Sequence, residues 1–163
     1  MSTFFGLYRG SVVNNVDPLR RARVQVSVPA LGDGQMTWAE ACSPYAGDGV
    51  GLVAVPPVGA SVWIGFEGGD ATRAVLLGGF WAGTSAPGNG LPTTKVLKTD
   101  GVTVTVDDLP GAGGLTIEVG PPVVPVAMKL ACTGSGIELS IGASKLMLSA
   151  ASVSINDGAL EVI

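Results

Sequence analysis

The C-terminal half of the sequence, from about Thr93 onward, alternates apolar and polar residues over many short runs and contains no aromatic side chain. Alternation with a period of two predicts β-strands that each have one dry and one wet face. Turn sequences such as Thr133-Gly134-Ser135-Gly136 and Asn156-Asp157-Gly158 separate the runs, and their spacing shortens to about seven to nine residues toward the C-terminus. This half is therefore predicted to be a narrowing ladder of short strands.

Such a ladder has no second layer with which to cover its apolar stripe, and domains of about 70 residues are marginal even with a complete core. Three identical chains wound about a common axis would turn their stripes inward and pair their strand edges. We therefore predict a C-terminal intertwined trimeric β-prism (a triple-stranded β-helix) in preference to one face of a monomeric β-sandwich or solenoid. The residues expected to pack at the trimer axis are Val102, Val104, Val106, Leu115, Ile117, Ile137, Leu139, Ile141, Leu146, Leu148, Val153 and Ile155.

The N-terminal half carries five strand candidates separated by turns rich in Gly, Pro, Asn and Asp. They span residues 7–13, 23–28, 37–42, 61–66 and 74–79. Five short strands within about 80 residues predict an OB-fold five-stranded barrel. The chain is thus expected to be all-β, with an OB-fold domain at 1–82, a Gly- and Pro-rich linker at 83–94 and a prism needle at 95–163.

Charge is scarce: charged residues make up 13% of the sequence and hydrophobic ones 47%, so much of the surface is expected to be interface. The net charge of −4 and the scattered arginines argue against nucleic acid as a partner. Neither a basic segment followed by an apolar one at the N-terminus nor an apolar run of membrane-spanning length occurs. We expect a protein made in the cytoplasm without a signal peptide.

The sequence offers little for catalysis or metal binding. Without histidine a Ser-His-Asp relay is impossible, and Cys42 and Cys132 have no CxxC spacing, so we expect no enzyme, no cofactor, no metal site and two buried thiols. Two carboxylate pairs, Glu67 with Asp70 and Asp107 with Asp108, and the glycine-rich run 111–114 are expected to form turns rather than an acid/base or phosphate site.

Four motifs in the first half together resemble one family. They are FGLYRGSVVNNVDP (5–18), RVQVSVP (23–29), WAEACSPYAG (38–47) and VPPVGASVWIGFEGGD (55–70). Their order and spacing resemble the OB domain of phage baseplate assembly protein V and of VgrG-type spikes of contractile injection systems, over about residues 4–81. The C-terminal ladder is similar in kind to the trimeric β-prism that follows this domain in the family.

The resemblance implies a homotrimeric central spike in a phage virion or an extracellular phage-tail-like particle, in transient contact with the target membrane. A baseplate hub protein is expected on the N-terminal side, as a separate subunit because the OB pattern begins at about residue 4. That missing hub domain disfavours a secretion-system VgrG. The apolar C-terminus suits docking of a PAAR-like tip protein, and Leu160, Val162 and Ile163 are the residues expected to carry it.

Two other functions remain open at this point. An OB-fold binding module for single-stranded nucleic acid or oligosaccharide could stack bases or sugars on Tyr8, Tyr45, Trp63 and Trp81, although the acidic balance favours core or inter-subunit packing for these rings. A trimeric adhesin or receptor-binding fibre is the other, which the short length and the apolar end disfavour. The mechanical spike is preferred over both.

Overall fold

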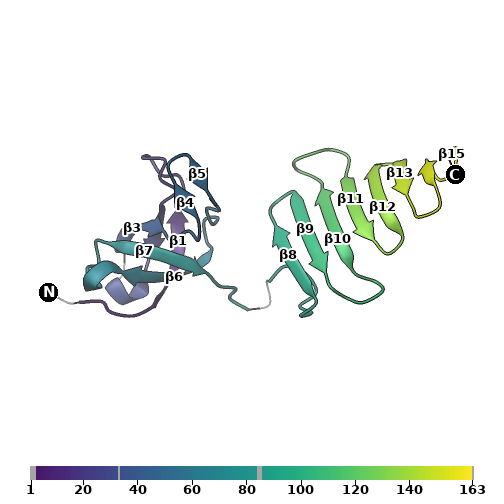
Figure 1. Cartoon of the computed structure of the whole chain (residues 1–163). Coiled ribbons are helices and arrows are strands. Elements are labelled where there is room, and N and C mark those ends of the chain that lie inside the picture. Colours follow the sequence, from purple (N-terminus) through teal and green to yellow (C-terminus); the bar gives the residue numbers. More distant parts are fainter. Residues whose placement is uncertain (1–2, 33, 84–85, 163) are drawn as a thin grey trace. The chain divides into compact units, whose positions relative to one another are not determined.

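The computed structural model describes residues 3–32, 34–83 and 86–162, and it is all-β apart from two short 3₁₀ helices (Figure 1). The chain forms two compact units, residues 1–85 and 86–163. No helix in the described ranges is long and apolar enough to cross a membrane.

The first unit is a closed five-stranded barrel, as predicted. Its strands follow the order β1-β2-β3-β7-β6, and all neighbours are antiparallel except β3 and β7, which are parallel. The bounds lie within one or two residues of those expected: β1 Tyr8–Asn14, β2 Val24–Ser27, β3 Met36–Ala41, β6 Ser61–Phe66 and β7 Ala74–Gly79.

Alternating side chains of these strands fill the barrel. In β6, Val62, Ile64 and Phe66 are buried while Trp63 lies on the outside, the pattern of a strand with one face toward the core. The rings of Phe4 and Tyr8 pack against Phe66 with centroids 5.8 and 5.4 Å away. The remaining buried core residues are Val12, Val24, Val26, Val28, Ala39, Ala74 and Leu76.

Smaller elements of this unit were not predicted. They are the 3₁₀ helices Pro29–Leu31 and Glu67–Gly69 and a two-stranded hairpin of β4 (Ala46–Gly47) and β5 (Val50–Gly51). Strands of two residues are too short to show any period. The hairpin depends on Gly51, where a Cβ atom would lie 2.7 Å from the Tyr45 carbonyl oxygen.

The second unit is an eight-stranded antiparallel sheet in which each strand pairs with the next along the chain. Its strands shorten toward the C-terminus (Figure 1), which confirms the narrowing ladder. They are β8 Thr94–Lys98, β9 Val102–Asp107, β10 Gly114–Val119, β11 Met128–Thr133, β12 Gly136–Ile141, β13 Ser144–Leu148, β14 Val153–Ile155 and β15 Leu160–Val162. Strand β8 is not predicted from the sequence, because lysines flank its adjacent Val96 and Leu97 and no alternation results.

No second layer covers this sheet within residues 86–162, the part of the unit that the structure describes. Ala131 is the only buried apolar residue of that range, at 5% exposure. A sheet with one apolar face needs a covering layer to keep that face from water. The cover for this one has to come from outside residues 86–162.

Candidate trimerisation face and barrel surface

One face of the C-terminal sheet is apolar along nearly its whole length. Residues that lie directly opposite each other on antiparallel neighbours project from the same face. Such pairs run from Val104 with Ile117, through Leu139 with Leu146, to Ile155 with Leu160. We call this the apolar face, and it contains every residue expected at the trimer axis together with Leu97, Val119, Met128, Leu130, Cys132, Leu160 and Val162.

The apolar face is largely exposed in the single chain. Val106, Leu115 and all expected axis residues from Ile137 to Ile155 are exposed, while Val102, Val104 and Ile117 are half-buried. Among its strand positions only Lys95 and Ser144 are polar. Patches of this extent on soluble proteins mark interaction sites.

The opposite face carries the charges. Lys129 and Glu138 lie 3.9 Å apart on neighbouring strands, and Lys145 on β13 pairs with Asp157 in the turn between β14 and β15. The hydrogen bond with Asp157 raises the pKa of Lys145, which therefore stays charged. Because Lys95 is the one charged residue among the described strand positions of the apolar face, the sheet has a defined wet face and a defined dry face.

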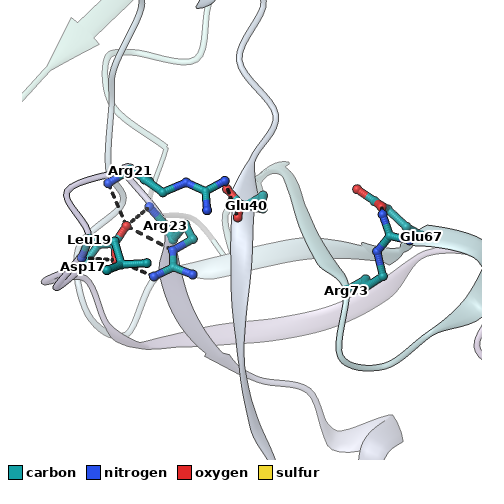
Figure 2. A network of polar contacts seen from close by, with 7 residues as sticks. All are labelled: Asp17, Leu19, Arg21, Arg23, Glu40, Glu67 and Arg73. Carbon is teal, nitrogen blue, oxygen red and sulfur yellow. Dashed lines mark hydrogen bonds and ion pairs between the residues drawn. The ribbon is translucent and has the colours of Figure 1, made fainter.

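On the barrel, a carboxylate organises the connection between β1 and β2 (Figure 2). Asp17 accepts hydrogen bonds from the backbone N–H groups of Leu19, Arg21 and Arg23 at 3.0, 2.8 and 3.3 Å. The Arg23 guanidinium donates two more, at 3.1 and 2.8 Å, and lies 5.3 Å above the Trp38 ring. These interactions hold the pKa of Asp17 far below its usual range, the Arg23 side chain being the main cause.

A groove of about 740 Å³ lies beside this network, lined among others by Met36 and Trp38. Its two outer arginines are paired with carboxylates: Arg21 lies 3.0 Å from Glu40, and Arg73 contacts Glu67 (Figure 2). Paired in this way, they leave little positive potential for phosphate groups. The groove is therefore a poor electrostatic match for nucleic acid.

Both units match known sequence families. Residues 8–81 match a model described as the Type VI secretion system/phage-baseplate injector OB domain, and residues 94–161 match the phage baseplate V C-terminal trimerisation domain. The chain belongs to the phage baseplate V family. No curated protein sequence matches it.

Membership of the baseplate V family explains why the C-terminal sheet has an uncovered apolar face, since the matched domain is described as a trimerisation domain. The match supports a homotrimer, association with a baseplate and a place in a virion or comparable particle. Both matched domains are structural parts of a baseplate or injector rather than enzymes.

The residues expected to dock a tip protein lie at the C-terminal end of this sheet. Leu160 and Val162 are on β15, exposed on the apolar face, and Ile163 lies outside the described residues. Within the described chain β15 pairs with β14 alone, so its other edge presents free backbone donors and acceptors.

The aromatic candidates are dispersed. Tyr8 packs in the barrel as expected, but Tyr45 and Trp81 are exposed. On the outer barrel surface Trp63 stacks with Phe80 at 4.8 Å between centroids, and the Arg9 guanidinium lies 5.2 and 5.0 Å from the two rings. Among the described residues, no ring contact joins any two of these four candidates.

The expectation of two buried thiols is wrong. Cys42 is exposed, because alternation from the buried Ala39 places it with Glu40 on the outer face of the barrel, whereas Cys132 is half-buried on the apolar face opposite Leu115 and Ile137. Within the described ranges, no three or more potential ligands gather in a way that could hold a metal ion.

The carboxylates act in turns, as predicted. Asp70 accepts hydrogen bonds from the N–H and hydroxyl of Thr72 at 2.9 and 2.8 Å, and Asp107 accepts one from Leu109 at 3.1 Å. The other two are engaged in ion pairs: Glu67 with Arg73 and Asp108 with Lys95. The glycine run at 111–114 likewise forms a turn, with the N–H of Gly113 donating to the Leu109 carbonyl at 2.7 Å.

Proposed function

We propose that the protein is the structural central spike of a contractile tail or phage-tail-like injection particle, acting as a homotrimer. One observation carries the proposal: a sheet with a continuous apolar face and no covering layer in residues 86–162 coincides with a matched trimerisation domain. Three such faces turned toward a common axis would cover one another. The twelve residues named above for the axis are the ones assigned this role.

Such a trimer would be stable and rigid, as a protein that transmits force needs to be. Burying apolar surface contributes about 25 cal/mol per Å², and the many axial Val, Ile and Leu side chains would be buried together. Close-packed interiors resist compression, and each ladder hydrogen bond would have to break with its neighbours. A trimeric prism would therefore transmit force without bending, and no chemical step is needed.

The two ends of the chain have different partners in this proposal. The barrels would dock on a separate baseplate hub protein, in keeping with the match to an injector OB domain. At the other end, Leu160 and Val162, with Ile163, would receive a PAAR-like tip protein, which could also pair with the open edge of β15. The tip would then meet the target membrane only transiently.

The mass of the purified protein in solution tests the proposal. Native mass spectrometry or light scattering after size exclusion should give three chains per particle. A stable monomer at micromolar concentration would refute the spike, because the apolar face would then be wet. Imaging of the assembled particle with this chain labelled should place it on the axis of the baseplate.

A further inference from the structure

A second uncovered apolar surface lies on the barrel unit, in the connection from β3 to β6. Residues 42–60 contain one charged side chain, that of Asp48. Six of their large apolar side chains are exposed, by 38–71%, and none belongs to the barrel core. We call this connection the apolar segment, and these side chains are Tyr45, Val50, Leu52, Val53, Val55 and Val58.

Hydrogen bonds hold the apolar segment in one conformation. The Ser43 hydroxyl lies 2.9 Å from the carbonyl oxygens of both Tyr45 and Leu52, and the Leu52 N–H donates to Tyr45 at 2.8 Å. At its far end the Gly59 N–H donates to the Val12 carbonyl at 2.8 Å. The backbone that carries the exposed side chains is therefore held in place before any partner binds, which lowers the entropy lost on binding.

The apolar segment also borders a hollow. A depression of about 350 Å³ is lined by Tyr45, Leu52 and Val55 from the segment, and by Arg21 and Leu76 from the barrel. Long connections that are ordered without burying their side chains usually serve a binding role. The apolar segment has this character.

We propose that the apolar segment is covered by the neighbouring barrel of the same trimer. The inference rests on the proposed function, because it requires three copies of the chain. An apolar surface nearly free of charge is typical of permanent homo-oligomeric interfaces, whereas surfaces that meet a partner transiently are more polar.

The link between each barrel and its C-terminal sheet keeps the barrels of one trimer close together. Residues 80–93 join β7 to β8 and reach about 50 Å when fully extended. Once the C-terminal sheets have assembled, each barrel is confined near two others at an effective concentration on the order of millimolar. At that concentration even a weak apolar contact is occupied, so three barrels close a ring about the axis.

Photo-crosslinking tests this contact in the full-length protein. A benzoylphenylalanine replaces Val53, which is 71% exposed, or in the control Met36, which is 56% exposed at the opposite end of β3. Irradiation of the dilute trimer should give a two-chain product from position 53, joined to a peptide from residues 1–85 of the second chain. Position 36 should give little. A trimer that yields no such product, or equal product from both positions, would overturn the inference and leave the spike intact.

Introducing charged residues on this surface gives a second readout. Leu52→Asp with Val53→Asp should preserve the three-chain mass but lower the melting midpoint of the barrel by about 4 °C or more. Met36→Asp should leave that midpoint nearly unchanged. If both variants melt like the parent, the segment is not an interface. If the parent chain is itself a monomer, this inference and the proposed function both fail.

Discussion

Leu139 lies directly opposite Leu146 on the neighbouring strands β12 and β13, and in the single chain the two residues are 44% and 39% exposed. Two leucines paired on one face of a sheet normally belong to a core. In the proposed trimer, other chains would supply the remaining sides of the core to which they belong.

Replacing Leu139 by Asp should abolish trimer formation, because three carboxylates would be forced together on a dry axis. Mass measurement in solution should then show single chains or aggregates. Ser140→Asp is the matched control, since the neighbouring residue projects from the opposite, polar face and should leave the trimer intact. A normal trimer from Leu139→Asp would mean that the inward face has been assigned wrongly.

Replacing Ile64 by Ala should destabilise the barrel by about 2–5 kcal/mol, because the side chain is fully buried and its removal leaves a cavity. Denaturant unfolding followed by tryptophan fluorescence measures the change, since all three tryptophans lie in the first unit. Val16→Ala, at a residue 75% exposed, should change stability by no more than about 0.5 kcal/mol. Equal effects from the two variants would contradict the core described above.

Asp17 should make barrel stability depend on acid pH. Its pKa is lowered in the folded state relative to the ordinary value of 3.8, so its contribution is complete above that value and is lost as the pH falls toward the folded pKa. Thermal melts of the parent from pH 6 to 2 should show this loss. Asp17→Asn should lower the midpoint at pH 6 and show a smaller further loss in acid. Parallel curves for the two proteins would exclude this role.

Single-stranded oligonucleotides should not bind the parent protein at low micromolar concentration, because Arg21 and Arg73 are paired with Glu40 and Glu67. Glu40→Gln with Glu67→Gln should unmask both guanidinium groups and produce weak binding that weakens with added salt. Fluorescence anisotropy measures both. Tight, salt-sensitive binding by the parent would favour the OB-fold binding module instead.

Changing Leu160 and Val162 to Asp should leave the trimer largely assembled, since most axial residues lie on β9 to β13. The variant should lose co-purification with a PAAR-like tip protein from reconstituted particles. Ser154→Asp, on the polar face of β14, should retain the tip. Retention of the tip by Leu160→Asp with Val162→Asp would place the docking surface elsewhere.

Period two made much of this fold predictable. Strands β9 to β12 and the barrel strands β2 and β6 alternate over four or more residues, and side-chain direction follows that alternation. Strands β1, β3 and β7 are predicted instead from strand-forming residues between turn sequences. The hairpin β4–β5 depends on Gly51 and on two-residue strands, which leave no pattern. The residue type of Cys42 favours burial, but alternation from the buried Ala39 places it on the outer face of the barrel with Glu40.

The candidate surfaces divide in the same way. Alternation along each strand predicts the apolar face, because every second side chain projects from the same side of the sheet. The exposure of the apolar segment is not predictable from the sequence, because a run such as Gly51-Leu52-Val53-Ala54-Val55 is as compatible with a buried strand as with an exposed connection. Only the folded chain shows that its side chains remain outside.

The shortening of the strands also sets where the C-terminal sheet would fail first. Strands of six residues form β9 to β12, whereas β14 and β15 have three each, so far fewer backbone bonds and apolar contacts secure the last rungs. We expect amide hydrogen exchange to be fastest in β14 and β15, and a mechanical load at the C-terminal end to unfold these two strands before the others. The damage would stay confined to the last two strands, while the longer strands keep their pairing.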